Sequence, residues 1–151
     1  YDEAVTTLGA LIVSGRPGQK TDVVQQVVDS CTKLKVDLNA LRCVHIAGTK
    51  GKGSTSSFTE RILREAGYKT GLYTSPHLVD VRERFRISGQ VLSKERFAEH
   101  FWHAHEVLTS DGSDLHFFHF LTVLGFYIFQ EEKVEVCVVE VGLGGRLDAT
   151  N

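Results

Sequence analysis

A glycine-rich loop with two lysines is the segment best suited to do chemistry. It reads Gly48-Thr49-Lys50-Gly51-Lys52-Gly53-Ser54-Thr55. Glycines let backbone N–H groups turn toward phosphate oxygens, and a helix that starts here adds unpaired donors and a positive dipole end. Lys52 supplies a point charge for the β- and γ-phosphates, and the hydroxyl of Ser54 or Thr55 can reach phosphate or Mg²⁺. The loop therefore predicts a site for a nucleoside triphosphate.

The spacing of this loop departs from the common phosphate-loop pattern G-x-x-x-x-G-K-[ST]. Counting back from Gly51, the first glycine would fall on Ile46, and Lys52 is followed by Gly53 before Ser54. The alternative is a surface loop that holds these residues by chance. A short buried strand is expected just before the loop, at residues 44–47, and a helix just after it. Because that order is the context a phosphate loop needs, we favour the functional interpretation.

Composition narrows the class of protein. The chain has 151 residues, 42% of them hydrophobic, and 17 basic against 19 acidic residues give a formal charge of −2. This is the size of one ordinary domain, with too balanced a charge to favour nucleic acid or a membrane surface. The longest apolar stretch, 117–129, is shorter than the roughly 20 residues of a bilayer span. Three distant cysteines without a CxxC pair favour neither a disulfide framework nor a zinc site, so we expect a reducing compartment, cytoplasmic or mitochondrial.

Hydrophobic periodicity predicts alternating helices and strands. Helices are expected over about 4–12, 24–34, 54–63, 97–108 and 117–129, and strands at 44–47, 70–74 and 134–141. Residues 80–87 are expected to be irregular or extended, and 15–18 and 111–114 to be loops. Thr21 or Asp22, and Ser93, are candidate helix N-caps. The alternation predicts an α/β fold, a phosphate-loop mononucleotide-binding core with a parallel sheet flanked by helices.

Two further segments place the loop in a family context. One is Thr74-Ser75-Pro76-His77-Leu78 with Val81-Arg82-Glu83-Arg84, and the other runs from Glu140 through Gly144-Gly145-Arg146-Leu147-Asp148-Ala149-Thr150-Asn151. In this order, the loop and these segments resemble the folylpolyglutamate synthase and dihydrofolate synthase family of the Mur ligase superfamily, with the eukaryotic-type folylpolyglutamate synthase favoured. The resemblance covers most of the chain from residue 44 onward. It implies that residues 1–151 are the N-terminal portion of a Mur-ligase-like ATP-binding domain, followed in a longer protein by the remainder of that domain and a glutamate-binding domain.

The resemblance implies an ATP-dependent amide ligase. ATP would phosphorylate the γ-carboxylate of a tetrahydrofolate, and the amine of L-glutamate would attack the acyl phosphate to give an amide, ADP and phosphate. Three alternatives stay open: a dihydrofolate synthase that uses dihydropteroate, another phosphate-loop enzyme, and a non-catalytic nucleotide-binding fragment. The implied cofactors are ATP and Mg²⁺, with a monovalent cation as an additional candidate. The implied partners are a folate or pteroate and L-glutamate, without nucleic acid or membrane, for a full-length monomer.

The resemblance also assigns roles near the triphosphate. Lys52 and the loop amides would hold the phosphates, and Ser75 and Glu140 match the Mg²⁺ ligands of the family, so that Lys52 and Glu140 are the catalytic candidates. The pattern agrees, since Ser75 follows one predicted parallel strand and Glu140 ends another, where α/β sheets place ligands. Hydroxyl and carboxylate oxygens suit Mg²⁺. The alternatives are an ion pair for Glu140 and an ordinary turn serine for Ser75.

A second group of residues is expected on the folate side. They are Arg82, Arg84, Arg146, Asp148, Ala149 and Asn151. The two arginines at 82 and 84, with Arg86, lie in a stretch that forms a mobile loop in the family, and a solvated charge run is the alternative. The four later residues lie in a turn whose composition also has a purely conformational explanation.

Other conspicuous side chains have a simpler interpretation. Phe118, Phe120 and Thr122 are expected mainly in the core, with a pterin pocket as the second interpretation. The three histidines of the predicted helix over 97–108 are expected at the surface rather than on a metal, because no Cys or Asp accompanies them at ligand spacing.

We expect residues 1–151 alone to be inactive, or nearly so. The family enzyme also needs a metal-ligating histidine, a carbamylated lysine and a glutamate-binding domain, all expected downstream of Asn151. The measurement is product formation from ATP, folate and L-glutamate by the isolated chain, side by side with the full-length protein. Comparable turnover by the two would contradict this expectation.

Overall fold

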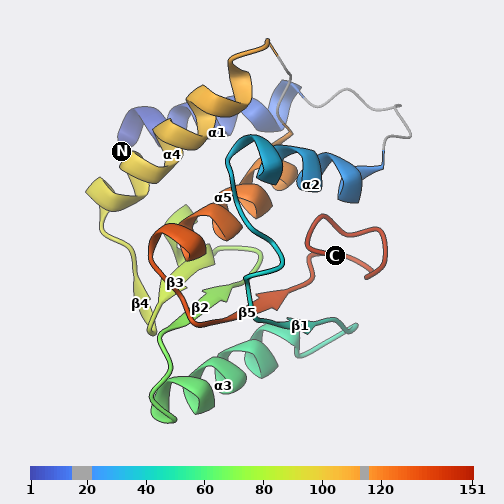
Figure 1. Cartoon of the computed structure of the whole chain (residues 1–151), viewed down its shortest axis with the longest axis vertical. Coiled ribbons are helices and arrows are strands. Elements are labelled where there is room, and N and C mark those ends of the chain that lie inside the picture. The colour runs from blue at the N-terminus through green and yellow to red at the C-terminus, as the bar shows by residue number, and fades with distance from the viewer. Residues whose placement is uncertain (15–21, 113–115) are drawn as a thin grey trace.

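A computed structural model describes residues 1–14, 22–112 and 116–151 of the chain (Figure 1). The expected loop at 15–18, and part of the one at 111–114, lie outside these residues. The elements in chain order are α1 (Asp2–Ser14), α2 (Val23–Lys33), β1 (Cys43–Ile46), α3 (Lys52–Glu65), β2 (Thr70–Tyr73), the short 3₁₀ helix η1 (Val81–Arg84), β3 (Phe85–Ile87), β4 (Gln90–Val91), α4 (Lys94–Thr109), α5 (Phe117–Glu131) and β5 (Val136–Glu140). The helices and strands alternate as expected for an α/β fold.

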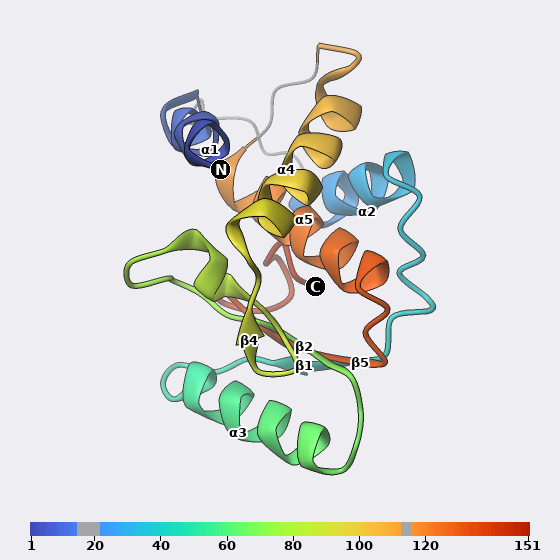
Figure 2. The same ribbon diagram turned by 90° about the vertical axis from the view of Figure 1, so that its left-hand side faces the viewer.

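The sheet has the strand order β1-β5-β2-β3-β4. Strands β1, β5 and β2 are parallel, whereas β3 and β4 are antiparallel additions at one edge. The prediction of a parallel sheet is thus confirmed for the three strands that lead into the expected site. The hairpin of β3 and β4 was not predicted, since a bridge of two residues carries almost no periodic signal. Figure 2 shows α3 alone on one face and the other four helices on the opposite face.

Helix α5 forms the centre of the core. Its residues from Phe120 through Phe129 are all buried, which confirms the predicted buried helix. Aromatic rings of β2, β3 and α4 pack beside it in one connected cluster. Strand β5 is buried from Cys137 to Glu140, as expected for a strand with neighbours on both sides. No described helix is long and apolar enough to cross a membrane.

The helix caps agree with the sequence at two of three sites. Asp22 accepts a hydrogen bond from the Gln25 backbone at 3.2 Å, and Ser93 caps α4 in the same way. Helix α3, however, begins at Lys52 instead of residue 54 or 55. The reason is that Gly51 serves as its N-cap, so Lys52 and Gly53 belong to the first helical turn.

Three further expectations were wrong. Strand β1 is mostly exposed instead of buried, because it lies at the edge of the sheet and pairs with β5 alone among the described strands. His100 is buried, not at the surface, and its Nε2 lies 3.0 Å from the Glu132 carboxylate. Cys43 and Cys137, 94 residues apart, face each other in register on β1 and β5 and are joined as a disulfide. The two cysteines are far apart in the sequence, and only the parallel register of β1 and β5 brings them together. The pair could therefore not be predicted from the sequence.

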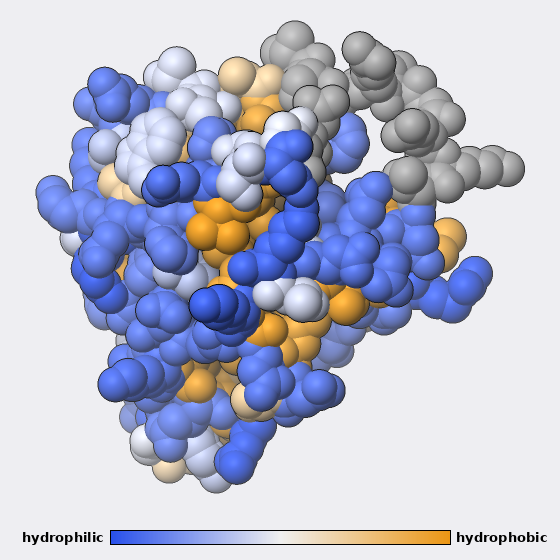
Figure 3. Space-filling model, turned by 45° about the horizontal axis from the view of Figure 1, so that its top comes forward, coloured by the Kyte–Doolittle hydropathy of each residue, from blue (hydrophilic) through white to orange (hydrophobic). Residues whose placement is uncertain are grey.

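The surface is mainly hydrophilic, but not everywhere. On the face drawn in Figure 3, apolar atoms show in the middle of a hydrophilic surround. On α3, Phe58 and Ile62 are 71% and 69% exposed, although the sequence pattern placed them on the packed side of a helix. The buried positions of that helix are instead Ser56 and Glu60, and Glu60 accepts hydrogen bonds from Thr70 and Arg64.

Gly71 of β2 marks the closest approach between the sheet and α5. A Cβ at this position would lie 2.7 Å from Cδ1 of Phe129, which is closer than packed atoms allow. We expect Gly71→Ala to lower the free energy of unfolding by about 1–3 kcal/mol, measured by urea denaturation. Gly9→Ala in α1 is the matched control, because nothing lies within 4 Å of its Cβ, and it should stabilise by about 0.5–1 kcal/mol. Wild-type stability of Gly71→Ala would contradict the packing described.

Candidate nucleotide and substrate site

The phosphate loop connects β1 to α3 and leaves the start of α3 open. Gly51 adopts φ 78°, a left-handed conformation that glycine tolerates best, and no side chain caps the helix. The first N–H groups of α3 therefore have no partner within the helix. Thr55 donates its hydroxyl to the Gly51 carbonyl at 2.9 Å. Of the two candidate hydroxyls, Ser54 is thus the one that no described residue engages.

The two loop lysines have no acidic partner in the described part of the chain. The stem of Lys52 runs back across the loop, since a Cβ on Gly48 would lie 3.7 Å from its Cγ. This arrangement keeps the ammonium group on the same loop as the open helix start. Free cations and unpaired N–H groups in one loop are suited to bind an anion.

Glu140 lies between the phosphate loop and the turn after β2. Its side chain is buried, and its Oε2 accepts the Ser75 backbone N–H at 2.9 Å. On the other side, a Cβ on Gly53 would lie 3.5 Å from its Oε1. The structure therefore brings Lys52, Ser75 and Glu140 to one edge of the sheet, as expected for residues at the ends of parallel strands.

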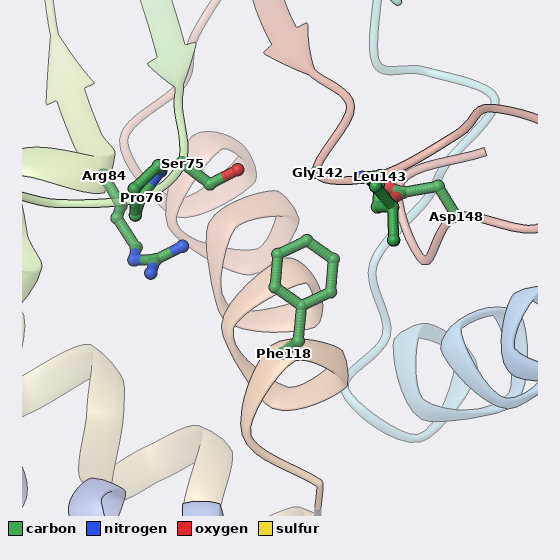
Figure 4. Close-up of a pocket in the computed structure, with 7 residues that line it drawn as sticks. All are labelled: Ser75, Pro76, Arg84, Phe118, Gly142, Leu143 and Asp148. Atoms are coloured by element: carbon green, nitrogen blue, oxygen red, sulfur yellow. The ribbon is translucent and has the colours of Figure 1, made fainter. Parts of the chain in front are cut away.

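A pocket of about 320 Å³ opens beside Ser75. Its lining residues are Ser75, Pro76, Arg84, Phe118, Gly142, Leu143 and Asp148. Figure 4 shows the Phe118 ring rising from α5 between Arg84 on one side and Asp148 on the other. Gly142 is needed here, because a Cβ would lie 2.5 Å from the Phe118 ring and 3.2 Å from the Asp148 carboxylate. The pocket thus joins an aromatic wall to two charged groups of opposite sign.

Arg84 is a buried cation with one unused donor. It is 5% exposed, its Nε donates to His77 Nδ1 at 2.8 Å, and its Nη1 has no hydrogen-bond partner among the described residues. Because Nδ1 of His77 accepts this bond, that nitrogen carries no proton. Burial and the Arg84 charge lower the pKa of His77, which favours the same neutral ring. A buried, unpaired guanidinium nitrogen in a pocket wall is suited to bind an acceptor on a ligand.

Asp148 is a carboxylate held by its own turn. Oδ1 accepts both the backbone N–H and the hydroxyl of Thr150, at 3.0 and 2.6 Å, and Oδ2 accepts the Leu143 N–H at 2.9 Å. Burial raises the pKa of Asp148, but these hydrogen bonds outweigh it, so that the pKa lies below its ordinary value. The group is therefore ionised and fixed in orientation.

The remaining folate-side candidates lie in varied environments. Arg82 is occupied by Asp80, through contacts of 2.8 to 3.2 Å, and by the Leu92 carbonyl at 2.9 Å. Arg146 and Asn151 are exposed at the C-terminal turn, and Ala149 is buried in it. Phe120 is fully buried in the core, as expected, whereas Phe118 of the same helix lines the pocket. The role of these residues in substrate binding stays a prediction.

The turn between Ser75 and η1 depends on Glu83, which the sequence analysis missed. The Glu83 carboxylate accepts the backbone N–H groups of Leu78, Val79 and Asp80 at 2.8, 3.1 and 2.9 Å. Asp80 and Glu83 form a capping box, whose acidic residues three apart are visible in the sequence. The contact between the side chains of His45 and Thr150 was also missed, because no sequence signal links two residues that lie 105 positions apart.

Oxygen donors at the sheet edge are the candidate ligands for a metal ion. The described residues hold no group of three or more His, Cys, Asp or Glu side chains that could enclose a metal ion. Ser75 and Glu140 each carry a hard oxygen ligand, and the backbone N–H of Ser75 is hydrogen-bonded to the Glu140 carboxylate. Such a pair fits Mg²⁺ when phosphate oxygens and water complete the coordination, because Mg²⁺ is commonly bound in that way.

The curated proteins and the solved structures that match this chain agree with one another. No protein-family model matches the chain. It is 48% identical over its whole length to a folylpolyglutamate synthase of Arabidopsis thaliana, and 44% identical to the mitochondrial folylpolyglutamate synthase of Homo sapiens. Among solved structures, it matches E. coli FolC in complex with DHPP and ADP with a TM-score of 0.83 and 35% identity, and an FPGS complex with AMPPCP and folate with a TM-score of 0.84 and 28% identity.

The matched regions are short relative to these proteins. The chain covers 26% of the Arabidopsis protein and 28% of the human one. In the two structures, 97% of this chain is aligned, against 34% of FolC and 37% of the FPGS chain. The comparisons therefore concern one part of larger enzymes.

The hydrogen bonds to Asp148 predict a pH-dependent stability. Because its pKa is lower in the folded than in the unfolded state, the stabilisation is complete above the ordinary value of 3.8 and is lost as the pH falls through the folded-state pKa. We expect Asp148→Asn to lower the free energy of unfolding at pH 7 by about 1–3 kcal/mol, and by less as the pH drops below about 4.

The measurement for Asp148→Asn is denaturant unfolding of both proteins from pH 7 to 3. Asp29→Asn, at an exposed position of α2, is the matched control and should remain close to wild type throughout. A constant difference between Asp148→Asn and wild type across this range would rule out the ionised carboxylate as its source.

Proposed function

Because this chain belongs to the folylpolyglutamate synthase family, we propose that it forms the ATP- and folate-facing part of a ligase that adds L-glutamate to tetrahydrofolates. The observation that carries the proposal is the position of Glu140, which contacts the turn at Ser75 and lies against the first turn of α3 at Gly53. One carboxylate would thus lie between the bound triphosphate and the substrate pocket. A triphosphate can react with a carboxylate substrate only when the two are held close together, so the loop and the pocket must be neighbours.

The phosphate loop would supply the positive charge, because its two lysines have no acidic partner among the described residues. Lys50, Lys52 and the loop N–H groups, from Gly48 through Thr55, would bind the triphosphate. Lys52 is the residue we expect to stabilise charge on the transferred phosphoryl group, as lysines of phosphate loops do. Ser54 keeps a free hydroxyl for phosphate or metal.

Ser75 and Glu140 would hold Mg²⁺. A carboxylate beside the helix start would repel bound phosphates, and a divalent cation between the two anions removes that repulsion. The cation also neutralises charge on the triphosphate when it is bound. The chain's own contribution is to fix the Glu140 carboxylate through the Ser75 N–H and thereby to set its orientation.

The pocket would bind the folate. Phe118 offers a flat apolar wall for an aromatic ring system, and Arg84 offers an unpaired Nη1 donor. The Asp148 carboxylate lines the same pocket and can accept from ring N–H groups. Arg82 would act through the loop that it holds, since Asp80 and Leu92 already occupy its donors. Arg146, Ala149 and Asn151 stay as further candidates on the C-terminal turn.

Dihydrofolate synthesis is the second candidate. It is favoured by the structural match to FolC with DHPP, and by a match to a bifunctional folylpolyglutamate synthase/dihydrofolate synthase from Yersinia pestis with a TM-score of 0.84. Eight curated relatives, 43% to 53% identical to this chain, carry the name folylpolyglutamate synthase, two of them marked putative, and we therefore place that activity first. Mitochondrial relatives from mammals support a mitochondrial or cytoplasmic enzyme, proposed as a monomer that binds neither nucleic acid nor membrane.

Turnover by the full-length protein that carries this sequence tests the proposal. With ATP, Mg²⁺ and labelled L-glutamate, we expect tetrahydrofolate to be extended and ADP and phosphate to form in equal amounts, and dihydropteroate to react more slowly. Lys52→Met should lower kcat by about 10²-fold or more, because it removes charge stabilisation of the transition state. Lys69→Met is the matched control and should retain activity, because Lys69 precedes β2 and so lies at the end of that strand away from Ser75.

Three outcomes would contradict parts of this proposal. Faster reaction with dihydropteroate would make the second candidate the function. ATP binding without glutamate transfer to either acceptor would reject the ligase. Full activity of Lys52→Met would reject the assigned role of the loop.

A further inference from the structure

Arg84 is a buried cation whose surroundings are neutral. Only 5% of the residue is exposed, its Nε donates to His77 Nδ1 at 2.8 Å, and its guanidinium carbon lies 5.9 Å from the centre of the Phe117 ring. The guanidinium forms no ion pair with an acidic side chain in the described part of the chain. A buried charge is costly unless an opposite charge accompanies it. A ligand with a negative charge at this position would remove that cost.

The guanidinium lies at the end of the pocket that is closest to Ser75. Figure 4 shows Arg84 and Ser75 on one side of the Phe118 ring, and Asp148 on the other side. The backbone contributes to this placement, because the N–H of Thr74 donates to the Arg84 carbonyl at 3.2 Å. The pocket therefore has a cationic end beside Ser75 and an anionic end at Asp148.

His77 determines the direction in which the guanidinium points. The group is planar, so a hydrogen bond at Nε fixes the plane in which Nη1 lies. His77 makes that bond and leaves Nη1 without a partner among the described residues. The turn that carries His77 is itself held, because the N–H of the next residue, Leu78, donates to the Glu83 carboxylate at 2.8 Å. The imidazole thus orients the free donor of Arg84 without competing for it.

We propose that Arg84, oriented by His77, binds a carboxylate at the glutamyl end of the folate. His77 is a positioning residue that acts through Arg84. The inference rests on the proposed function, because it requires a folate to bind in this pocket. Three observations carry it: the burial of the cation, its free Nη1 donor and the lack of an acidic partner. Hydrogen bonds between a guanidinium and a carboxylate are charge-assisted, and they are about twice as strong as bonds between neutral groups.

The two charged ends of the pocket also set the orientation of the substrate. A folate carries its carboxylates at the glutamyl end and N–H donors on its ring system. With the glutamyl end at Arg84, a carboxylate lies on the Ser75 side, where the phosphate loop and Glu140 are expected to hold the triphosphate. The reversed orientation would bring carboxylates toward Asp148, and like charges repel. A ring carbonyl is the other acceptor that a folate could offer to Nη1, but it would leave the buried cation without an anion.

The test compares two ligands of the full-length protein, tetrahydrofolate and its diamide, in which both carboxylates are carboxamides. Calorimetry gives the Kd of each. In the wild type we expect the diamide to bind about tenfold or more weakly, because it loses the charge-assisted bond. Arg84→Met removes the guanidinium and keeps a long unbranched side chain. It should weaken tetrahydrofolate by about the same factor and leave the diamide nearly unchanged, so that the two Kd values converge.

Variants of His77 separate positioning from general damage. His77→Leu removes the acceptor and should narrow the ratio of the two Kd values, whereas His77→Asn keeps an acceptor at the δ position and should retain it. The Kd of a non-hydrolysable ATP analogue with Mg²⁺ should stay at the wild-type value in both, since damage to the turn at Ser75 would change it. Arg61→Met, at an exposed position of α3, is the matched control for loss of an arginine. Because His77 is only partly buried, His77→Leu decides the question if Arg84→Met does not fold.

The outcomes distinguish this inference from the proposed function. Equal weakening of tetrahydrofolate and the diamide in Arg84→Met would assign Arg84 to the ring system and overturn the inference, and so would equal Kd values in the wild type. An unchanged ratio in His77→Leu, or a weaker ATP analogue in that variant, would overturn the positioning role. Failure of the wild type to bind either folate ligand would overturn the proposed function itself.

Discussion

The parallel alignment of β1, β5 and β2 is the constraint on which the site depends. In a parallel sheet all strands end at one edge, so the loops that follow them meet there. Here those loops are the phosphate loop after β1, the turn at Ser75 after β2 and the glycine-rich turn after Glu140. The buried α5 packs closely against β2 at Gly71 from one face. An antiparallel arrangement would have sent one of these loops to the far side of the molecule.

Glycines then decide how closely the three loops approach each other. Gly53 leaves room for the Glu140 carboxylate, and Gly142 leaves room for both Phe118 and Asp148. Gly51 has a different task, because its left-handed conformation starts α3 without a side-chain cap and leaves the helix N–H groups free. The same residue type thus provides space at two positions and backbone geometry at the third. These glycines let the loop that is expected to bind phosphate lie close to the pocket.

Sequence alone predicted the elements with strong periodic signals and the residues at their ends. The helices and the parallel strands followed from pattern and order, and so did the place of Ser75 and Glu140 at one edge of the sheet, which the family resemblance also implied. The phosphate-binding role of the loop stays a prediction. The sequence analysis missed features created by folding. The pair Cys43 and Cys137, the exposure of β1 and the contact of His45 with Thr150 depend on register and on which strand lies at the edge. No local sequence pattern predicts such contacts. The capping box formed by Asp80 and Glu83, in contrast, could have been predicted from the spacing of the two acidic residues.

Hydrogen-bond satisfaction separates the groups that shape the site from those left for a ligand. Asp80, Arg82, Glu83 and Asp148 each have partners within the chain, so their main effect is to fix the turns that carry them. Arg84 Nη1, the two loop lysines and the first N–H groups of α3 have no such partners among the described residues. Of these, the buried Nη1 of Arg84 is costly unless a ligand accepts from it, whereas the loop donors lie at a largely exposed surface where water can accept from them. All of them are donors, so the site as a whole selects ligands rich in acceptors and negative charge. That selection is the chemical requirement shared by a triphosphate and a carboxylate substrate.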